Sequence, residues 1–189
     1  MRTRPSRDET RARLFAAAAD VFVRVGIGAA TVEEVATAAD LTRGAVYSNF
    51  RNKDELCIAV LDEVRAERLA EILDIMAKPD TSLRVEALQV WAERVVGDPA
   101  WTSLEVEFAA HARHNEPLRH DLASRLTTIL QILTGATESA DAAKPQLAGG
   151  ETAIVMLALG VGLGLLRSID PSIPVDGLVD VLRLVSDQT

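Results

Sequence analysis

The chain has 189 residues, 48% of them hydrophobic, and a formal net charge of −8. That length supports a well-buried core, and the single cysteine, Cys57, excludes a disulfide framework within the chain. Residues 1–54 carry nine Lys or Arg against seven Asp or Glu, whereas the remainder carries 11 against 21. A small cationic end on an acidic body argues against a protein that coats nucleic acid indiscriminately, and favours one that meets phosphate at one end.

The sequence predicts neither an export signal nor a membrane span. No apolar run follows Arg2 and Arg4 closely enough to form a secretory signal. The most apolar segment, residues 153–166, has 14 residues and is shorter than the roughly 20 that cross a bilayer. We therefore expect a buried helix there, no membrane contact and a cytoplasmic location.

Apolar residues recur at helical spacing almost throughout, which predicts an all-α protein of about nine helices. The first helix is expected over about residues 8–25 and ends at Gly26. Capping boxes at Thr31 and Asn52 begin helices that extend to about Ala39 and Met76, with a short helix from Thr42 between them. Later helices are expected around 88–95, from 99, from 116 to 133, over 151–168 and over 175–185, with a loop over 135–150.

The long helix over residues 53–76 is predicted to link two domains. Residues 1–52 would form an N-terminal arm and a helical module, and residues 53–189 a larger helical domain. The helix over 151–168 carries Gly160, Gly162 and Gly164, each of which weakens a helix. Close approach of a partner helix would offset that cost, so we expect the helices over 151–168 and 175–185 to form a homodimer interface.

Residues 31–50, TVEEVATAADLTRGAVYSNF, predict two short helices joined by a tight turn. Neither would be stable alone, so Val35, Ala36 and Val46 are expected to pack on the first helix. This construction is a helix-turn-helix. The alternative is a plain corner of a helical core, in which Tyr47 is a packing residue.

The second short helix would present its N-terminal end to a duplex. Thr42 suits a phosphate, and Arg43 suits a guanine or a phosphate. Ala45 suits a thymine methyl group, and Gly44 lets the backbone come close. These residue types favour DNA binding.

The spacing of these and neighbouring residues resembles the N-terminal signature of the tetracycline-repressor (TetR) family of bacterial regulators, over about residues 10–56. The matching positions are Leu14, Ala17, Ala18, Phe22, Gly26, Thr31, Val32, Val35, Ala36, Leu41, Thr42, Gly44, Tyr47, Phe50, Lys53 and Leu56. The resemblance implies phosphate contacts by Thr31, Thr42, Tyr47 and Lys53. It implies base contacts by Arg43, Ala45, Ser48 and Asn49.

Two residues depart from the family pattern. Asp40 stands where the family usually has glycine in the turn, and Asn49 stands where it often has histidine. Asp tolerates a left-handed backbone better than most residues, so we expect the turn to survive. Asn49 leaves the base preference open.

The resemblance also implies an apolar effector cavity between the linker helix and its neighbours. The side chains expected in its wall are Trp91, Trp101, Glu105, Phe108 and His111. An aromatic cluster with one or two polar groups is typical of small-molecule pockets, and ordinary core packing is the alternative for each residue.

No metal or cofactor is predicted. Glu107, His111 and His114 lie at helical spacings that could offer metal ligands, but no second motif or cysteine completes a site. The sequence also lacks a nucleophile with a paired base, so we predict that the protein is not an enzyme. A helical metalloenzyme built on those three residues is the remote alternative.

These features predict a sequence-specific DNA-binding transcriptional regulator, a ligand-responsive repressor that binds a palindromic operator as a homodimer. Its expected partners are a double-stranded DNA operator, a second copy of the chain and a small-molecule effector. The alternative is a helical dimer that sequesters a small apolar molecule or a protein partner without specific DNA binding.

Overall fold

A computed structural model of the chain describes residues 7–140 and 149–186, and within these ranges it is built from helices without strands. The helices are α1 (Arg7–Val25), α2 (Val32–Ala38), α3 (Arg43–Tyr47), α4 (Lys53–Met76), α5 (Thr81–Val95), α6 (Pro99–Ala112), α7 (Glu116–Ala140), α8 (Gly149–Ile169) and α9 (Asp176–Ser186). The predicted all-α fold with an N-terminal helix-turn-helix is confirmed. Residues 1–6 of the predicted arm lie outside the described residues.

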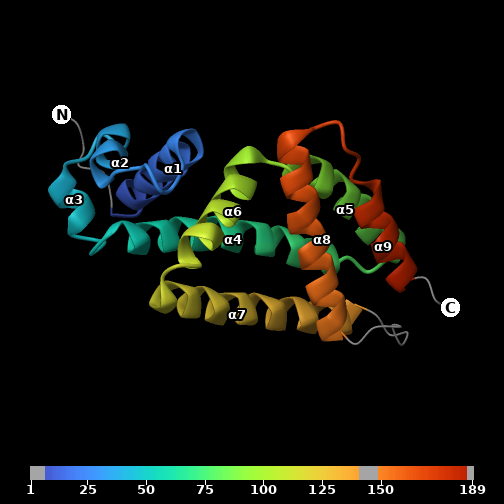
Figure 1. Ribbon diagram of the computed structural model, residues 1–189. Helices are drawn as coiled ribbons and strands as arrows, with labels where there is room; N and C mark the ends of the chain where they lie inside the picture. Colours follow the sequence, from blue (N-terminus) through green and yellow to red (C-terminus); the bar gives the residue numbers. More distant parts are fainter. Residues whose placement is uncertain (1–6, 141–148, 187–189) are drawn as a thin grey trace.

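The helices form two groups that share α4. Figure 1 shows α1, α2 and α3 at one end of the molecule and α5, α8 and α9 at the other, with α4 running between them. Helix α7 packs along α4, and α6 packs against both α1 and α8. The 24 residues of α4 give it a length of roughly 36 Å, enough to reach both groups.

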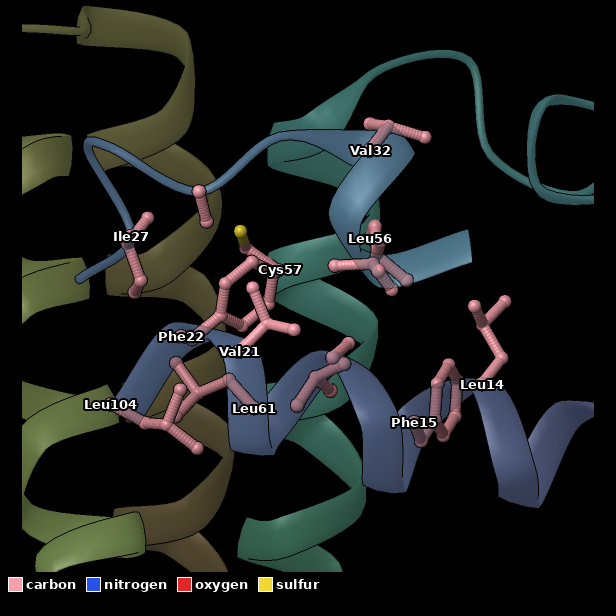
Figure 2. Packing of buried hydrophobic residues seen from close by; sticks show 14 of the residues in the cluster. Leu14, Phe15, Val21, Phe22, Ile27, Val32, Leu56, Cys57, Leu61 and Leu104 are labelled. Atoms are coloured by element: carbon pink, nitrogen blue, oxygen red, sulfur yellow. The ribbon is translucent and has the colours of Figure 1, made fainter. Parts of the chain in front are cut away.

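The first hydrophobic core joins the three N-terminal helices to the rest of the chain (Figure 2). Phe22 of α1, Val35 of α2 and Val46 of α3 are fully buried in it, as the helix-turn-helix interpretation requires. The same cluster contains Leu56 of α4 and Phe108 of α6. It therefore crosses the predicted domain boundary at residues 52 and 53, and that division stays a prediction.

A second core lies at the opposite end, between the C-terminal part of α4 and helices α5 and α9. Ile75, Trp91, Val95 and Leu178 are buried in it. Trp101 of α6 packs against its edge, and its ring meets that of Trp91 at a centroid distance of 6.4 Å. The two tryptophans thus mark the place where α5 and α6 converge.

The prediction of a loop over residues 135–150 is wrong at both of its boundaries. Helix α7 continues through Gly135 to Ala140, and α8 already begins at Gly149, while residues 141–148 lie outside the described residues. An added Cβ at Gly135 would meet no atom within 4 Å, so this glycine is tolerated on a helix surface. One glycine lowers helix stability by about 1 kcal/mol relative to alanine, and the 25-residue helix forms in spite of it.

The prediction that the apolar segment 153–166, which lies in α8, is buried is also wrong for the single chain. Ile154, Leu166 and Ile169 of α8 are more than half exposed. Residues Gly150–Ile169 have a mean hydropathy of 1.9 and would be long enough to cross a membrane by length and composition alone. The helix is nevertheless tied to its neighbours, because Arg167 Nε donates to the Val96 carbonyl at 2.8 Å.

Gly160, Gly162 and Gly164 of α8 have different surroundings. A Cβ at Gly164 would stand 3.2 Å from Thr102 Oγ1, so this glycine lets α6 approach α8 within the chain. A Cβ at Gly160 or Gly162 would meet no atom within 4 Å. The close approach predicted for all three is therefore made within the chain by Gly164.

Candidate functional site

The helix-turn-helix begins at Thr31, which caps α2 through a complete capping box. Glu34 N–H donates to Thr31 Oγ1 at 3.2 Å, and Thr31 N–H donates to Glu34 Oε2 at 2.9 Å. The hydrogen bond from the Thr31 backbone lowers the pKa of the Glu34 carboxyl. Thr31 is exposed, so the predicted phosphate contact is sterically open.

The turn between α2 and α3 is held by Asp40 in the left-handed region, with φ of 55°. Leu41 N–H closes the turn by donating to the Ala36 carbonyl at 2.8 Å. Arg13 Nη2 of α1 donates to the Ala39 carbonyl at 2.7 Å and lies 3.5 Å from the Asp40 carboxylate. The aspartate therefore does replace glycine in the turn, as predicted from its tolerance of this conformation.

Helix α3 is a single short segment anchored by the buried Val46. Thr42 is its N-cap and accepts from Ala45 N–H at 3.1 Å. Most of the predicted contact residues lie on its exposed surface: Thr42, Arg43, Gly44, Tyr47, Ser48 and Asn49, with Ala45 half-buried beside them. The predicted contacts of residues 42–49 are thus brought together on and beside α3, whereas Thr31 lies at the start of α2 and Lys53 at the start of α4.

The side chains of α3 differ in how firmly they are held. Arg43 forms an ion pair with Glu33 of α2 at 2.7 Å, and its guanidinium lies 5.2 Å from the centre of the Tyr47 ring. Ser48 Oγ and Asn49 Nδ2 both donate to the Ala45 carbonyl at 2.8 Å. Any base contact by Ser48 or Asn49 must compete with these hydrogen bonds within the helix.

Lys53 is not oriented as the predicted phosphate contact requires. Its ammonium group donates to the carbonyl oxygens of Ile27, Gly28 and Ala30 at 2.8, 3.0 and 3.0 Å. A lysine ammonium has three donors, so these bonds use all of them. The side chain holds the loop between α1 and α2.

Glu107 of α6 holds the same loop from the other side, a role that could not be predicted from the sequence. Its Oε2 accepts from Ile27 N–H at 2.6 Å and would stand 3.0 Å from a Cβ at Gly26. Gly26 has φ of 81°, as expected of a residue that ends a helix. The helical spacing of Glu107 carries no information about a partner 80 residues earlier.

A cavity of about 200 Å³ lies among α4, α5, α6, α7, α8 and α9. Three of the five predicted wall residues line it: Trp91, Trp101 and Glu105. The other two do not. Phe108 is buried in the N-terminal core, and His111 Nε2 lies 2.9 Å from Asp54 Oδ1 of α4.

The polar part of the wall comes chiefly from two arginines of α4 that the sequence analysis missed. Arg65 donates to Glu105 through Nε at 2.6 Å and through Nη2 at 2.5 Å, and both side chains are about 15% exposed. Arg68 lies 3.3 Å from both Glu71 and Asp98. A signal existed, because these arginines interrupt an apolar stripe that continues through Leu69 and Ile72 of α4.

The tryptophan indoles belong to the same network. Trp91 Nε1 donates to Glu71 at 2.7 Å, and Trp101 Nε1 donates to Glu105 at 3.3 Å. Burial alone would raise the pKa of Glu71, but the donors of Trp91, Arg94 and Arg68 outweigh it and lower that pKa. These donors thus favour the charged form of Glu71.

The residues weighed as metal ligands have separate roles. Glu107 binds the Ile27 amide and His111 binds Asp54, while His114 Nε2 lies 3.2 Å from Arg113. Within the described ranges, no group of three His, Cys, Asp or Glu side chains could hold a metal ion. Cys57 is a core residue, and burial raises the pKa of its thiol to about 12.

Comparisons with known proteins agree with this architecture. A family model described as bacterial regulatory proteins, tetR family, matches residues 14–60. "Probable HTH-type transcriptional regulator ArpR" of Pseudomonas putida is 36% identical over 103 residues, which cover 50% of this chain and 47% of that protein. The HTH-type transcriptional regulator TtgR of the same species is 41% identical over 63 residues, which cover 33% and 30%. The matches therefore span less than half the length of these curated relatives.

Solved structures match nearly the whole chain at low identity, which shows the fold alone. The TetR-family transcriptional regulator SCO4454 from Streptomyces coelicolor has a TM-score of 0.73 at 21% identity, covering 95% of this chain and 97% of that one. The fatty acid degradation regulator FadR from Bacillus halodurans has a TM-score of 0.73 at 17% identity, covering 95% and 100%. With the helix-turn-helix geometry, the sequence matches show that residues 14–60 are a region of the tetR family of bacterial regulatory proteins, and the chain as a whole has the fold of these solved structures.

Proposed function

We propose that the protein is a sequence-specific DNA-binding transcriptional regulator of the cytoplasm, a homodimer whose affinity for a palindromic operator responds to a small-molecule effector. The observation that carries the DNA-binding part is the exposed surface of α3, where Thr42, Arg43 and Tyr47 stand together on a helix fixed by the buried Val46. Short helices of this kind enter the major groove with their N-terminal end first. The names of the relatives, all HTH-type regulators, support the same function.

The dimer is inferred from the apolar surface of α8. Ile154, Val155, Leu165, Leu166 and Ile169 are exposed on it. Covering these side chains with the same helices of a second copy, α8 and α9, would remove apolar surface from water. Two copies would place two α3 helices on successive major grooves, about 34–36 Å apart.

The effector response is inferred from the two ends of α6. Trp101 and Glu105 of this helix line the cavity, and Glu107 and His111 contact the loop between α1 and α2 and the start of α4. A ligand that binds better to one position of α6 would bias the position of α3, because only a difference in affinity shifts the equilibrium. In a repressor, the favoured position would separate the two α3 helices from their grooves.

The test of DNA binding is a mobility shift with the region upstream of the protein's own gene, at stated salt concentration. Tyr47→Ala and Arg43→Ala should both weaken binding, and Arg43→Ala should relax the preference at one base pair by about 1–3 kcal/mol. Arg119→Ala is the matched control, because Arg119 is an exposed arginine of α7, outside the helix-turn-helix. Unaltered binding by both α3 variants would contradict the assignment.

Equal losses on specific and random duplexes would make Arg43 a phosphate contact instead of a base contact. Failure of the wild-type protein to retard any genomic DNA, together with ligand binding in the cavity, would favour a helical dimer that sequesters a small apolar molecule.

A further inference from the structure

We propose that the effector is an uncharged apolar molecule, about the size of one substituted aromatic ring, with one hydrogen-bond-accepting oxygen for the arginines of the cavity wall. The proposal rests on the effector response proposed above and adds the chemical class of the ligand. It is carried by the size and lining of the cavity, by the balance of charges around it and by two guanidinium nitrogens that lack hydrogen-bond partners.

The size of the cavity limits the ligand to a small molecule. Its volume is about 200 Å³, and an engineered apolar cavity of about 150 Å³ in another protein holds benzene. Aliphatic and aromatic side chains from six helices form most of the wall, among them Leu69, Ile129, Met156 and both tryptophans. A single ring with a short substituent therefore fits the space, and burying it is favourable.

Six charged side chains in and around the cavity wall already pair with one another. Three guanidinium groups face three carboxylates: Arg65 binds Glu105, Arg68 binds Glu71 and Asp98, and Arg94 binds Glu71. Arg84, which also lines the wall, donates to the Lys78 carbonyl and the Thr81 hydroxyl. A charged ligand would bring net charge into an apolar site, which is unfavourable without a counter-charge.

Two donors of this network have no partner in the described part of the chain. Arg65 Nη1 and Arg68 Nε are buried and make no hydrogen bond. A buried donor without an acceptor is costly, and an acceptor supplied by a ligand removes that cost. Both nitrogens are buried, although their side chains line the cavity, so the guanidinium groups must turn for a ligand oxygen to reach them. The unmet groups are donors, so a carbonyl oxygen fits them and an ammonium group does not.

The test compares four ligands built on one ring: acetophenone, ethylbenzene, benzoate and 1-phenylethylammonium. Calorimetry of the full-length protein gives each Kd, and NMR signals of the indole N–H groups report the location. Trp91 and Trp101 are the two tryptophans of the chain, and both line the cavity. Acetophenone should bind about tenfold more tightly than ethylbenzene, because its oxygen accepts from a charged donor. Benzoate and the ammonium compound should bind more weakly than acetophenone.

Two variants test the arginines directly. Arg65→Lys keeps a positive charge opposite Glu105 and removes Nη1, and Arg68→Lys removes the other orphaned nitrogen. In each variant, the ratio of the Kd for ethylbenzene to the Kd for acetophenone should fall toward one, while the affinity for ethylbenzene is retained. Arg119→Lys, at an exposed arginine of α7, is the matched control and should keep the wild-type preference. Circular dichroism checks that all three are folded.

Equal binding of acetophenone and ethylbenzene, tighter binding of benzoate or of the ammonium compound, or binding of none of the four would overturn the proposal. A different result would contradict the proposed DNA-binding function. A protein that binds its upstream DNA through α3 but none of these ligands contradicts the ligand class alone, and one that binds acetophenone but no DNA contradicts the regulator function.

Discussion

Lys53 lies at the start of α4, close to the predicted DNA surface, yet its ammonium group is directed into the protein. It donates to three carbonyl oxygens of the loop between α1 and α2, which Glu107 holds from the opposite side through the Ile27 amide. One side chain of α4 and one of α6 therefore hold this loop. The side chain positions the helix-turn-helix, whereas the family resemblance assigns it to a phosphate.

Lys53→Met should lower the free energy of unfolding by about 1–3 kcal/mol, because three carbonyl groups lose a charged donor. The slope of log K against log salt concentration for DNA binding should stay unchanged, since no phosphate contact is lost. Urea denaturation and binding titrations at several salt concentrations measure the two effects. Lys78→Met, two residues beyond the C-terminal end of α4, is the matched control. A slope reduced by about one with unaltered stability would make Lys53 a phosphate contact.

The connection between α5 and α6 shows how one element limits another. Gly97 has φ of 92°, and a Cβ there would stand 2.5 Å from Arg167 Cβ of α8. Arg167 also donates to the Val96 carbonyl, so α8 packs directly on this turn. The glycine both ends α5 and admits α8, which fixes α8 beside the cavity.

Gly97→Ala should destabilise the protein by about 2–4 kcal/mol, because strain from the left-handed backbone adds to the clash with Arg167. Gly28→Ala is the control, since a Cβ at Gly28 would meet no atom within 4 Å. Its unfolding free energy should equal or exceed that of the wild type by up to about 1 kcal/mol. The urea midpoints of the two variants measure this difference in stability. Equal midpoints would contradict the prediction and would show that α8 can move away from residue 97 with little loss of stability.

The helices themselves were largely predictable from the sequence, because caps and helical periodicity are local. Thr31 with Glu34, Asn52 with Glu55 and the left-handed Asp40 are found in the predicted places, although Glu55 accepts from Arg51 N–H instead of Asn52 N–H. Contacts between helices were less accessible. Glu107 and Ile27 are 80 residues apart, and which face of α6 meets the cavity depends on how α4 and α8 pack. For that reason the cavity wall includes Trp101 and Glu105 but not Phe108 or His111.

For the molecule as a whole, the exposed apolar surface of α8 has consequences for its assembly. Leu166→Glu with Ile169→Glu should convert the proposed dimer into monomers, because charged side chains in the interface would lose their hydration. Sedimentation velocity measures the change, and operator affinity should fall at least tenfold as the second α3 helix is lost. Val90→Glu, at a residue of α5 that is 63% exposed, should leave both properties intact. A double variant that remains dimeric would place the interface elsewhere.

Stability should fall in acid across the molecule. Hydrogen bonds from neighbouring donors lower the pKa of four carboxyl groups: Glu34, Glu55, Glu116 and Asp170. Burial opposes the lowering of the pKa of Glu71, but its three donors prevail. A carboxyl group whose pKa is lowered by folding stabilises the folded state above its unfolded pKa, and this contribution disappears as the pH falls through the folded pKa.

The urea midpoint should therefore decrease steadily from about pH 5 to about pH 3. Glu71→Gln should make this decrease shallower, whereas Glu67→Gln, at an exposed residue of the same helix, should not. A midpoint independent of pH over this interval would mean that these carboxyl groups keep their ordinary pKa values in the folded chain.

The hydrophobic core shared by the N-terminal helices and the rest of the chain bears on how such regulators can be recombined. The family match ends at residue 60, but Leu104, Phe108 and Leu118 complete the core on which α1 packs. A chimera that exchanges only the N-terminal module with a relative would place these side chains against a foreign surface. Successful grafting requires that the matching faces of α6 and α7 travel with the module, even though they lie outside the region that the family model matches.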